Sequence, residues 1–403
     1  MGYVQPLTFA TARETVLRIA SGSASLPLIE TLPLDQCSGR VLASDIRADR
    51  AYPSFARSVR DGFALSSTGF QGLARIVGEV KAGQHFHRAL GQGEAVAIMT
   101  GAPVPEGADA VIMVEHTRVE HTSVADATMT TDRAIQSRDN IVFPGTECAT
   151  GAVVVPRGTR LDYAHVATLA TVGATQVPVY RRPSIAVLAT GDELVPADTE
   201  PAPYQIRNSN APMLATQIRR AGACPVVLPV ARDEYEPTRS LIEQGLQSDM
   251  LLLSGGVSAG KYDLVETVLS DLGAEFFFDR VLIQPGQPLV FGRVRDRLVF
   301  GLPGNPVSSA VTFELFARIA IDAWSGASQL TPGFLRAPLA APFRHRMGLT
   351  RFLPAVLQDG IVTHKSWQGS GDVFAVASAN AFLVAREDRE SWDTGDLIEV
   401  LPR

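Results

Sequence analysis

The chain has 403 residues, of which 46% are hydrophobic and 19% are charged, and its net charge is −6. This composition predicts two to four globular domains with large cores and argues against nucleic acid as a partner. The three cysteines, Cys37, Cys148 and Cys224, lie far apart, so neither a Cys-x-x-Cys zinc site nor a disulfide framework is expected. We also expect a cytoplasmic protein with no membrane contact, because no signal-type run or membrane-length apolar stretch occurs.

The N-terminal half predicts a helix followed by a β-rich lobe. Apolar residues recur at helical spacing over residues 8–20. From about residue 46 to 140, glycines alternate with short apolar runs at residues 95–99 and 110–114, which is typical of strands. Turn-forming residues fill the segment between these two runs, so propensity predicts a hairpin there. A second helix is expected over residues 161–172.

The pattern changes after residue 183, where buried apolar runs alternate with helices. Strands are predicted at residues 185–189, 226–228 and 250–253, and helices at residues 237–244 and 263–272. A further helix starts near Asn210, which we interpret as its cap, and ends at Gly222. These repeats predict a doubly wound parallel sheet that binds ligands beyond the carboxyl ends of its strands. Short alternating runs after residue 329 predict a closing β-domain or barrel.

Two loops of this α/β domain carry acids or glycines directly after a strand. In the first, Gly191 permits close approach of a ligand, and at least one of Asp192 and Glu193 must face the crevice. An ordinary solvated turn is the alternative interpretation of this loop. In the second, Ser254 to Asp263, glycines ahead of a helix leave backbone N–H groups free to bind an anion.

The second loop nearly matches a nucleotide-binding P-loop. Gly255, Gly260 and Lys261 have the required spacing, but Tyr262 stands where a serine or threonine should bind Mg²⁺. This difference argues against a P-loop NTPase. Asp263 also has a structural interpretation, since it can cap the helix that follows.

Two further loops contain proline and glycine. The prolines and Gly286 of residues 284–288 make a stiff turn that holds the amides of Gln284 and Gln287 outward. In residues 301–308, Asn305 followed by a proline is typical of a helix N-cap, which leaves Gly304 and Ser308 without a structural explanation. Outside this domain, residues 58–63 form a turn with an acid at its apex.

Together, these loops and the turn-rich segment at residues 99–109 resemble the molybdopterin molybdenumtransferase family (MoeA and the gephyrin E domain). The resemblance implies an α/β multidomain fold: a split linker domain (1–46 plus 145–180), a β-rich inserted lobe (47–144), a central doubly wound, MogA-like α/β domain (181–328) and a C-terminal β-barrel domain (329–403). It further implies a homodimer whose composite active site lies between the α/β domain of one subunit and the lobe of the other.

The resemblance also implies a reaction in molybdenum cofactor biosynthesis. Family members insert molybdate into adenylylated molybdopterin in the presence of Mg²⁺ and release AMP. Their upstream donor is the molybdopterin-adenylylating protein. Such a reaction needs an anion cradle and carboxylates for the cation rather than a covalent nucleophile.

The resemblance assigns roles to individual positions of this chain. The catalytic positions are Asp61, Thr100, Glu193, Asp233 and Asp263. The metal ligands are Asp192, Glu193, Asp233 and Asp263. The cofactor-binding positions are Ser254, Gly255, Gly256, Ser258, Gly260, Lys261, Gln284, Gly286, Gln287, Pro288, Pro303, Gly304, Asn305 and Ser308.

The chain departs from the family pattern in three places. Gln284 and Gln287 stand where the family usually carries lysines that help to hold molybdate. The family's Phe-x-Arg ends here in Pro354, although Arg351 is close by, and Arg60 replaces a usual methionine. A non-catalytic paralogue that binds molybdopterin or a partner protein, as a carrier or scaffold, is therefore the alternative function.

Overall fold

The computed structural model describes residues 5–22, 28–123, 126–256, 264–330 and 333–403. The chain forms two compact units. The smaller contains residues 45–156 and 164–175, and the larger contains residues 1–44, 157–163 and 176–403. Within the described ranges, no helix is long and apolar enough to cross a bilayer. The finer four-domain boundaries stay a prediction.

The sequence predicts a β-rich lobe here, and the smaller unit is built on a six-stranded sheet. The strand order is β7-β4-β6-β5-β9-β8. Phe63 and Leu65 of β4 pack on one face, whereas Ala64 packs on the other. The strands are β4 (Gly62–Leu65), β5 (Leu73–Val80), β6 (Glu94–Ile98), β7 (Ala110–Met113), β8 (Arg118–Ser123) and β9 (Asp126–Thr130).

The predicted hairpin between β6 and β7 is wrong. Both strands pair with β4, which lies between them and is antiparallel to each. All four residues of β4 are buried, so it takes a central place in the sheet. A Cβ on Gly62 would lie 1.8 Å from the carbonyl oxygen of Ile112, which shows how closely β4 and β7 approach. The segment after β6 therefore crosses over β4 instead of turning back.

Short two-stranded pairs complete the smaller unit. β2 (Ile46–Arg47) pairs with β11 (Val153–Val155), and β3 (Arg57–Ser58) pairs with β10 (Ile141–Val142). Helix α2 (Tyr163–Thr171) ends before Gly173, whose φ of 73° fits a helix stop. The observed helix lies within the residues predicted for it.

The larger unit contains the predicted α/β sheet, with strand order β16-β13-β17-β21-β20-β18. The first four strands are parallel, and β20 and β18 extend the sheet in antiparallel fashion. Their bounds are β13 (Ser184–Ala189), β16 (Cys224–Val227), β17 (Met250–Ser254), β18 (Glu275–Arg280), β20 (Pro288–Val294) and β21 (Arg297–Leu302). The predicted strands at residues 185–189, 226–228 and 250–253 correspond to β13, β16 and β17.

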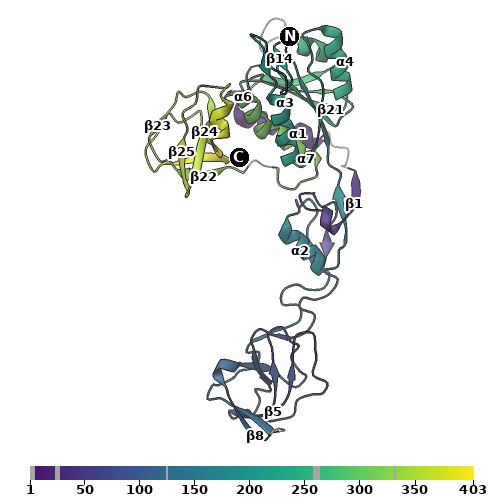
Figure 1. The fold of residues 1–403 in the computed structure, drawn as a ribbon, viewed down its shortest axis with the longest axis vertical. Coiled ribbons are helices and arrows are strands. Elements are labelled where there is room, and N and C mark those ends of the chain that lie inside the picture. Colours follow the sequence, from purple (N-terminus) through teal and green to yellow (C-terminus); the bar gives the residue numbers. More distant parts are fainter. Residues whose placement is uncertain (1–4, 23–27, 124–125, 257–263, 331–332) are drawn as a thin grey trace. The chain divides into compact units, whose positions relative to one another are not determined.

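Alternate residues of β13 point into two different cores. Ile185 and Val187 join the core on the side of α1, α3, α6 and α7, while Ala186 and Leu188 join the core on the side of α4 and α5. Helices therefore cover both faces (Figure 1), and the doubly wound arrangement is confirmed. The helices are α1 (Phe9–Gly22), α3 (Asn210–Arg220), α4 (Tyr235–Gly245), α5 (Leu264–Asp271), α6 (Pro306–Thr312) and α7 (Arg318–Trp324).

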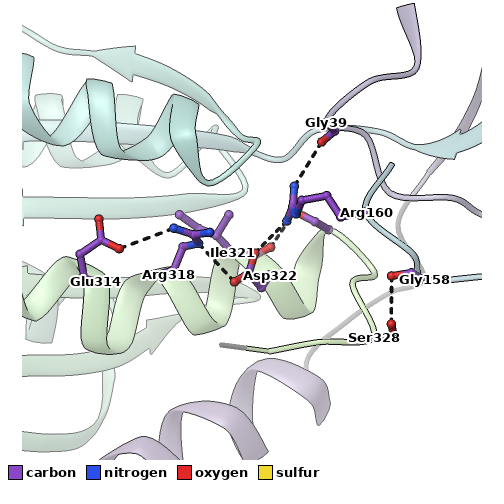
Figure 2. Close-up of polar contacts among 9 residues, drawn as sticks. Gly39, Gly158, Arg160, Glu314, Arg318, Ile321, Asp322 and Ser328 are labelled. Carbon is purple, nitrogen blue, oxygen red and sulfur yellow. Dashed lines mark hydrogen bonds and ion pairs between the residues drawn. The ribbon is translucent and has the colours of Figure 1, made fainter. Parts of the chain in front are cut away.

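Helices α6 and α7 are joined by a π-helical stretch, Phe313–Ala317, and carry a buried charge network. Arg160 Nη2 lies 2.8 Å from Asp322 Oδ1, and Arg318 Nε lies 3.2 Å from Asp322 Oδ2. Arg160 Nη1 also donates to the carbonyl oxygen of Gly39 at 3.2 Å (Figure 2). Because the carboxylate of Asp322 is almost fully buried, this network fixes the residue 157–163 segment on α7 within the larger unit.

The C-terminal region is rich in strands, as predicted. Its main sheet has the order β19-β24-β26-β28-β22, with β25 paired to β24. The strands are β19 (Ile283–Gln284), β22 (Leu335–Pro338), β24 (Thr350–Gln358), β25 (Ile361–His364), β26 (Ala381–Ala385) and β28 (Leu397–Pro402). The smaller elements are β23 (Phe343–Arg344), β27 (Ser391–Trp392) and α8 (Val373–Ala377).

Two further strand pairs of the larger unit lie outside its six-stranded sheets. β1 (Ile29–Pro33) pairs with β12 (Gln176–Tyr180), and β14 (Leu194–Val195) pairs with β15 (Ile206–Arg207).

Candidate functional site

A cavity of about 500 Å³ opens at the carboxyl ends of β13, β17 and β21. Thr190, Ser254 and Pro303, the residues at or just after these strand ends, all line it. The three loops are tied by backbone bonds, with Thr190 N donating to the Ser254 carbonyl oxygen at 3.1 Å and Gly255 N donating to the Leu302 carbonyl oxygen at 3.2 Å. The cavity therefore lies where an open parallel sheet binds its ligands.

The predicted glycines around this cavity have different structural roles. Gly255 and Gly256 have φ of 91° and 64°, and a Cβ on either would lie within 2.8 Å of Thr190 atoms. The fold itself therefore requires glycine at both positions. At Gly304 a Cβ would meet only the Cα of Gly255, at an ordinary 3.6 Å. Gly304 leaves space that a ligand can use.

Asn210, which the sequence suggested as a helix cap, organises the cavity wall instead. Helix α3 has Ser209 at its N-cap position, and the side chain of Asn208 accepts a hydrogen bond from Ala211 N at 3.1 Å. The Asn210 amide donates to Ser254 Oγ at 2.8 Å and to the Gly304 carbonyl oxygen at 2.7 Å. The cap interpretation was wrong because the Asn210 side chain bonds to these acceptors, which lie 44 and 94 residues away in the sequence, and not to the first turn of α3.

Two oxygen atoms in the cavity wall are buried and have no hydrogen-bond partner within the described part of the chain. They are Thr190 Oγ1 and Asn210 Oδ1, and their residues are only 6% and 9% exposed. Buried polar atoms are normally paired, and an unmade bond costs about 1–3 kcal/mol. Within the described residues, these two atoms keep unused hydrogen-bonding capacity in the cavity wall.

The predicted acids gather at one edge of the cavity. Glu193 and Asp233 line it, and Asp192 Oδ1 accepts a hydrogen bond from Asp233 N at 3.3 Å. Partial burial raises the pKa of the Asp233 carboxyl, and the nearby charges of Asp192 and Glu193 raise it further. The three carboxylates repel one another, and a cation would relieve this repulsion.

The carboxylates at this edge are ligands of the type that Mg²⁺ accepts. Among the described residues, no group of three or more Asp, Glu, His or Cys is arranged to hold a metal ion. Mg²⁺ usually takes only one or two carboxylates and completes its shell with water and substrate phosphates. Glu193 and Asp233 supply that donor set at the cavity edge. The predicted ligand Asp263 lies outside the described residues, as do Ser258, Gly260 and Lys261.

Arg207 is a site residue that the sequence analysis missed. It is the only basic side chain among the described residues that line the cavity. Its Nε donates to the Thr199 carbonyl oxygen at 3.0 Å, and the side chain is exposed. The polar residues 207–209 directly ahead of α3 were the available signal, but the sequence interpretation used only Asn210, as a helix cap.

The glutamine loop reaches the cavity through Pro288 alone. Gln284 and Gln287 are exposed and are not among the lining residues, whereas Gly286 is buried. Gly286 has a φ of 101°, and a Cβ there would lie 2.5 Å from Thr312 Cγ2, so the loop packs tightly on α6. Gln284 pairs with Arg351 across β19 and β24.

Of the predicted residues in the last loop, Pro303, Gly304 and Asn305 line the cavity. Asn305 occupies the N-cap position of α6, as expected, but its amide donates to Ser370 Oγ at 2.8 Å. Ser308 is buried and is not among the lining residues. Its role in binding a cofactor stays a prediction.

In the smaller unit, the structure brings together the predicted pair Asp61 and Thr100. Asp61 Oδ1 accepts hydrogen bonds from Thr100 N at 2.7 Å and from Thr100 Oγ1 at 2.9 Å. These bonds, the backbone one first, lower the pKa of the exposed Asp61 carboxyl. Asp61 is therefore held as an oriented carboxylate directly before the start of β4.

Comparison with known proteins covers nearly the whole chain. Residues 7–173 match the family model "MoeA N-terminal region (domain I and II)", residues 186–323 match "Probable molybdopterin binding domain", and residues 336–402 match "MoeA C-terminal region (domain IV)". A molybdopterin molybdenumtransferase of Bacillus subtilis is 35% identical over 386 residues, which span 92% of this chain and 89% of the relative. One of Staphylococcus epidermidis is 31% identical, spanning 99% and 96%.

Solved structures agree with this relationship. A crystal structure of the molybdopterin biosynthesis MoeA protein from Pyrococcus horikoshii OT3 is 26% identical, covers 99% of this chain and 100% of that chain, and superposes with a TM-score of 0.84. A second solved structure, also of a molybdopterin biosynthesis MoeA protein from Pyrococcus horikoshii, is 30% identical with a TM-score of 0.76, covering 99% of each chain. The order of the three matched regions, their coverage and the shared fold all agree. The chain belongs to the molybdopterin molybdenumtransferase (MoeA) family.

Proposed function

We propose that this protein is an enzyme of molybdenum cofactor biosynthesis that inserts molybdate into adenylylated molybdopterin, with Mg²⁺, and releases AMP. The observation that carries the proposal is the cavity, whose lining includes Thr190 and Asn210, each with a buried oxygen that has no partner among the described residues, and the acids Glu193 and Asp233. Its relatives named molybdopterin molybdenumtransferase support the same reaction.

The cavity supplies positioning and charge. Thr190 Oγ1 can donate to the substrate, while Asn210 Oδ1 can accept from an N–H group such as those of a pterin. Arg207 offers the positive charge that suits a phosphate, and Gly304 leaves room beside it. Mg²⁺ held by Glu193 and Asp233 would neutralise the charge that develops on the pyrophosphate. This chain's own contribution is to hold the substrate with its phosphates next to those carboxylates.

We further propose a homodimer with a composite active site. Thr100 orients the carboxylate of Asp61, which has no cation partner among the described residues. Both residues belong to the smaller unit, whereas the residues that line the cavity belong to the larger unit. A second subunit would supply this pair to the cavity. The substrate would come from a molybdopterin-adenylylating protein.

The direct test measures AMP release from adenylylated molybdopterin by the purified full chain, with Mg²⁺ and a titration of molybdate. We expect molybdate-dependent release that Glu193→Gln or Asp233→Asn reduces by about a hundredfold or more. Arg219→Gln, at an exposed position on α3 outside the cavity, is the matched control. Absence of AMP release across the whole molybdate range would contradict the proposal.

The exposed glutamines favour a second candidate, a paralogue that binds the substrate without turning it over. Neutral Gln284 and Gln287 give a weaker attraction for an oxyanion than two cations would. In that case molybdopterin or AMP binds, but no AMP is released. Replacing both glutamines by lysine should then restore turnover, whereas an active wild-type protein would exclude this candidate.

A further inference from the structure

A second cavity, of about 320 Å³, lies between helix α1 and the chain near Arg386. Its polar lining consists of Arg13 and Glu14 from α1, together with Arg386. Its apolar wall includes Leu17, Ile319 and Leu330. None of these residues lines the cavity at the strand ends, so the two cavities are distinct.

Two guanidinium groups share the same pair of aromatic rings beside this cavity. Arg13 Cζ lies 5.5 Å from the Phe9 ring centre and 5.4 Å from that of Phe334. Arg386 Cζ lies 5.2 Å and 5.7 Å from the same two rings. The rings themselves meet edge to face at 6.3 Å. Cation–π contact stabilises each arginine, but it also brings two like charges together.

The charges of these two arginines are unequally compensated. Arg386 Nε donates to Glu399 Oε2 at 2.8 Å, so this guanidinium is paired. Arg13 has no carboxylate partner within the described ranges, and its Nε is buried without a hydrogen-bond acceptor. Desolvation, and then the charge of Arg386, lower the pKa of Arg13. Glu14, at the adjacent position of α1, is exposed.

We propose that this cavity binds a small organic carboxylate with a short apolar body. A carboxylate would give the fork of Arg13 the acceptor it lacks and would separate the two like charges. The hydrocarbon part would lie against Leu17 and Leu330, of which Leu17 is 38% exposed and so leaves apolar surface open. This site is independent of the proposed molybdate chemistry.

The test titrates 3-phenylpropionate into the purified full chain by calorimetry, with saturation-transfer NMR as a second measurement. 3-Phenylpropanol, which has the same body without charge, is the ligand control. We expect millimolar or tighter binding of the carboxylate, weaker binding at high salt, and binding of the alcohol that is weaker by about tenfold or more. Acetate alone should bind more weakly than 3-phenylpropionate, because it lacks the apolar body.

Variants of α1 assign the binding to Arg13. Arg13→Gln should weaken binding by about tenfold or more, and Arg13→Lys, which keeps the charge but not the fork, should be intermediate. Arg18→Gln, exposed on the same helix and outside the cavity, should stay within about twofold of the wild type. Thermal unfolding of the ligand-free variants checks that they are folded. The comparisons of salt and of the alcohol use the wild type and therefore do not depend on the variants.

Three results would overturn the proposal. They are absence of 3-phenylpropionate binding to the wild type in the millimolar range, equal binding to Arg13→Gln, and equal binding of the alcohol. A change in sedimentation of Arg13→Gln without any carboxylate binding would show instead that a second copy of the chain covers this cavity.

Discussion

The side-chain amide of Asn210 lies 2.8 Å from Ser254 Oγ and 2.7 Å from the carbonyl oxygen of Gly304. One side chain at the start of α3 thus joins the loops that follow β17 and β21. Ser309 extends this network, because its Oγ donates to the Pro303 carbonyl oxygen at 2.6 Å. The cavity wall is therefore held by buried polar contacts between segments far apart in the chain.

Asn210→Ala should lower the free energy of unfolding by about 1–3 kcal/mol, because it leaves the Gly304 carbonyl oxygen without its donor in a partly buried site. Chemical denaturation measures the change. A double-mutant cycle with Ser254→Ala should show a coupling of about 0.5–3 kcal/mol, since the two side chains bond directly. Additive effects of the two substitutions would show that the network does not stabilise the fold.

Thr190→Val, unlike Asn210→Ala, should leave stability unchanged and lower the affinity for the ligand. Thr190 Oγ1 is buried and unpartnered within the described residues, so a methyl group in its place loses no internal hydrogen bond. We expect the free energy of unfolding to change by less than about 0.5 kcal/mol or to rise. Affinity for AMP or molybdopterin should fall, because the ligand loses a donor. A large loss of stability with unchanged ligand affinity would assign this hydroxyl to the fold alone.

Much of the fold could be predicted from the sequence, because strands buried on both faces are continuous apolar runs. Residues 185–189 and 250–253 therefore stood out, and their loops were placed correctly at the strand ends. The roles of Asn210 and the path between β6 and β7 could not be predicted. Both depend on partners distant in sequence, and local propensity favours a cap or a hairpin in such segments.

Arg207→Gln should weaken AMP binding by about five- to twentyfold at low salt, because it removes the only basic side chain among the described lining residues. The salt dependence of binding should also become shallower. Calorimetry with AMP measures both effects. Arg219→Gln, near the far end of α3, is the matched control and should bind like the wild type. Equal losses in the two variants would point to a general effect of net charge.

Thr100→Val should raise the pKa of Asp61 toward its ordinary value. The backbone N–H of Thr100 lowers that pKa most and its hydroxyl adds to the effect, so removing the hydroxyl leaves part of the shift. Because the folded pKa is depressed, the contact stabilises the loop above the unfolded pKa of about 3.9 and is lost as pH falls through the folded value.

Carboxyl-carbon NMR of Asp61 as a function of pH measures this shift. Thr146→Val, which removes a hydroxyl from the same unit where it bonds to the Phe143 carbonyl oxygen, should leave the titration unchanged. An Asp61 pKa that is the same in wild type and Thr100→Val would show that the backbone donor alone sets it.

Gly304→Ala separates folding from ligand binding. Its added methyl would meet only Gly255 Cα at 3.6 Å, and Gly304 has no positive φ, so the fold tolerates the change. We expect a free energy of unfolding within about 0.5 kcal/mol of the wild type, or slightly higher because alanine restricts the unfolded chain. The methyl would occupy space beside Gly255, another residue of the cavity lining, and reduce affinity for a phosphate-bearing ligand. Gly22→Ala, at the exposed end of α1, is the control and should leave that affinity unchanged. Unaltered binding by Gly304→Ala would mean that the ligand does not approach this loop and is held by the other cavity walls, which follow β13 and β17 and precede α3.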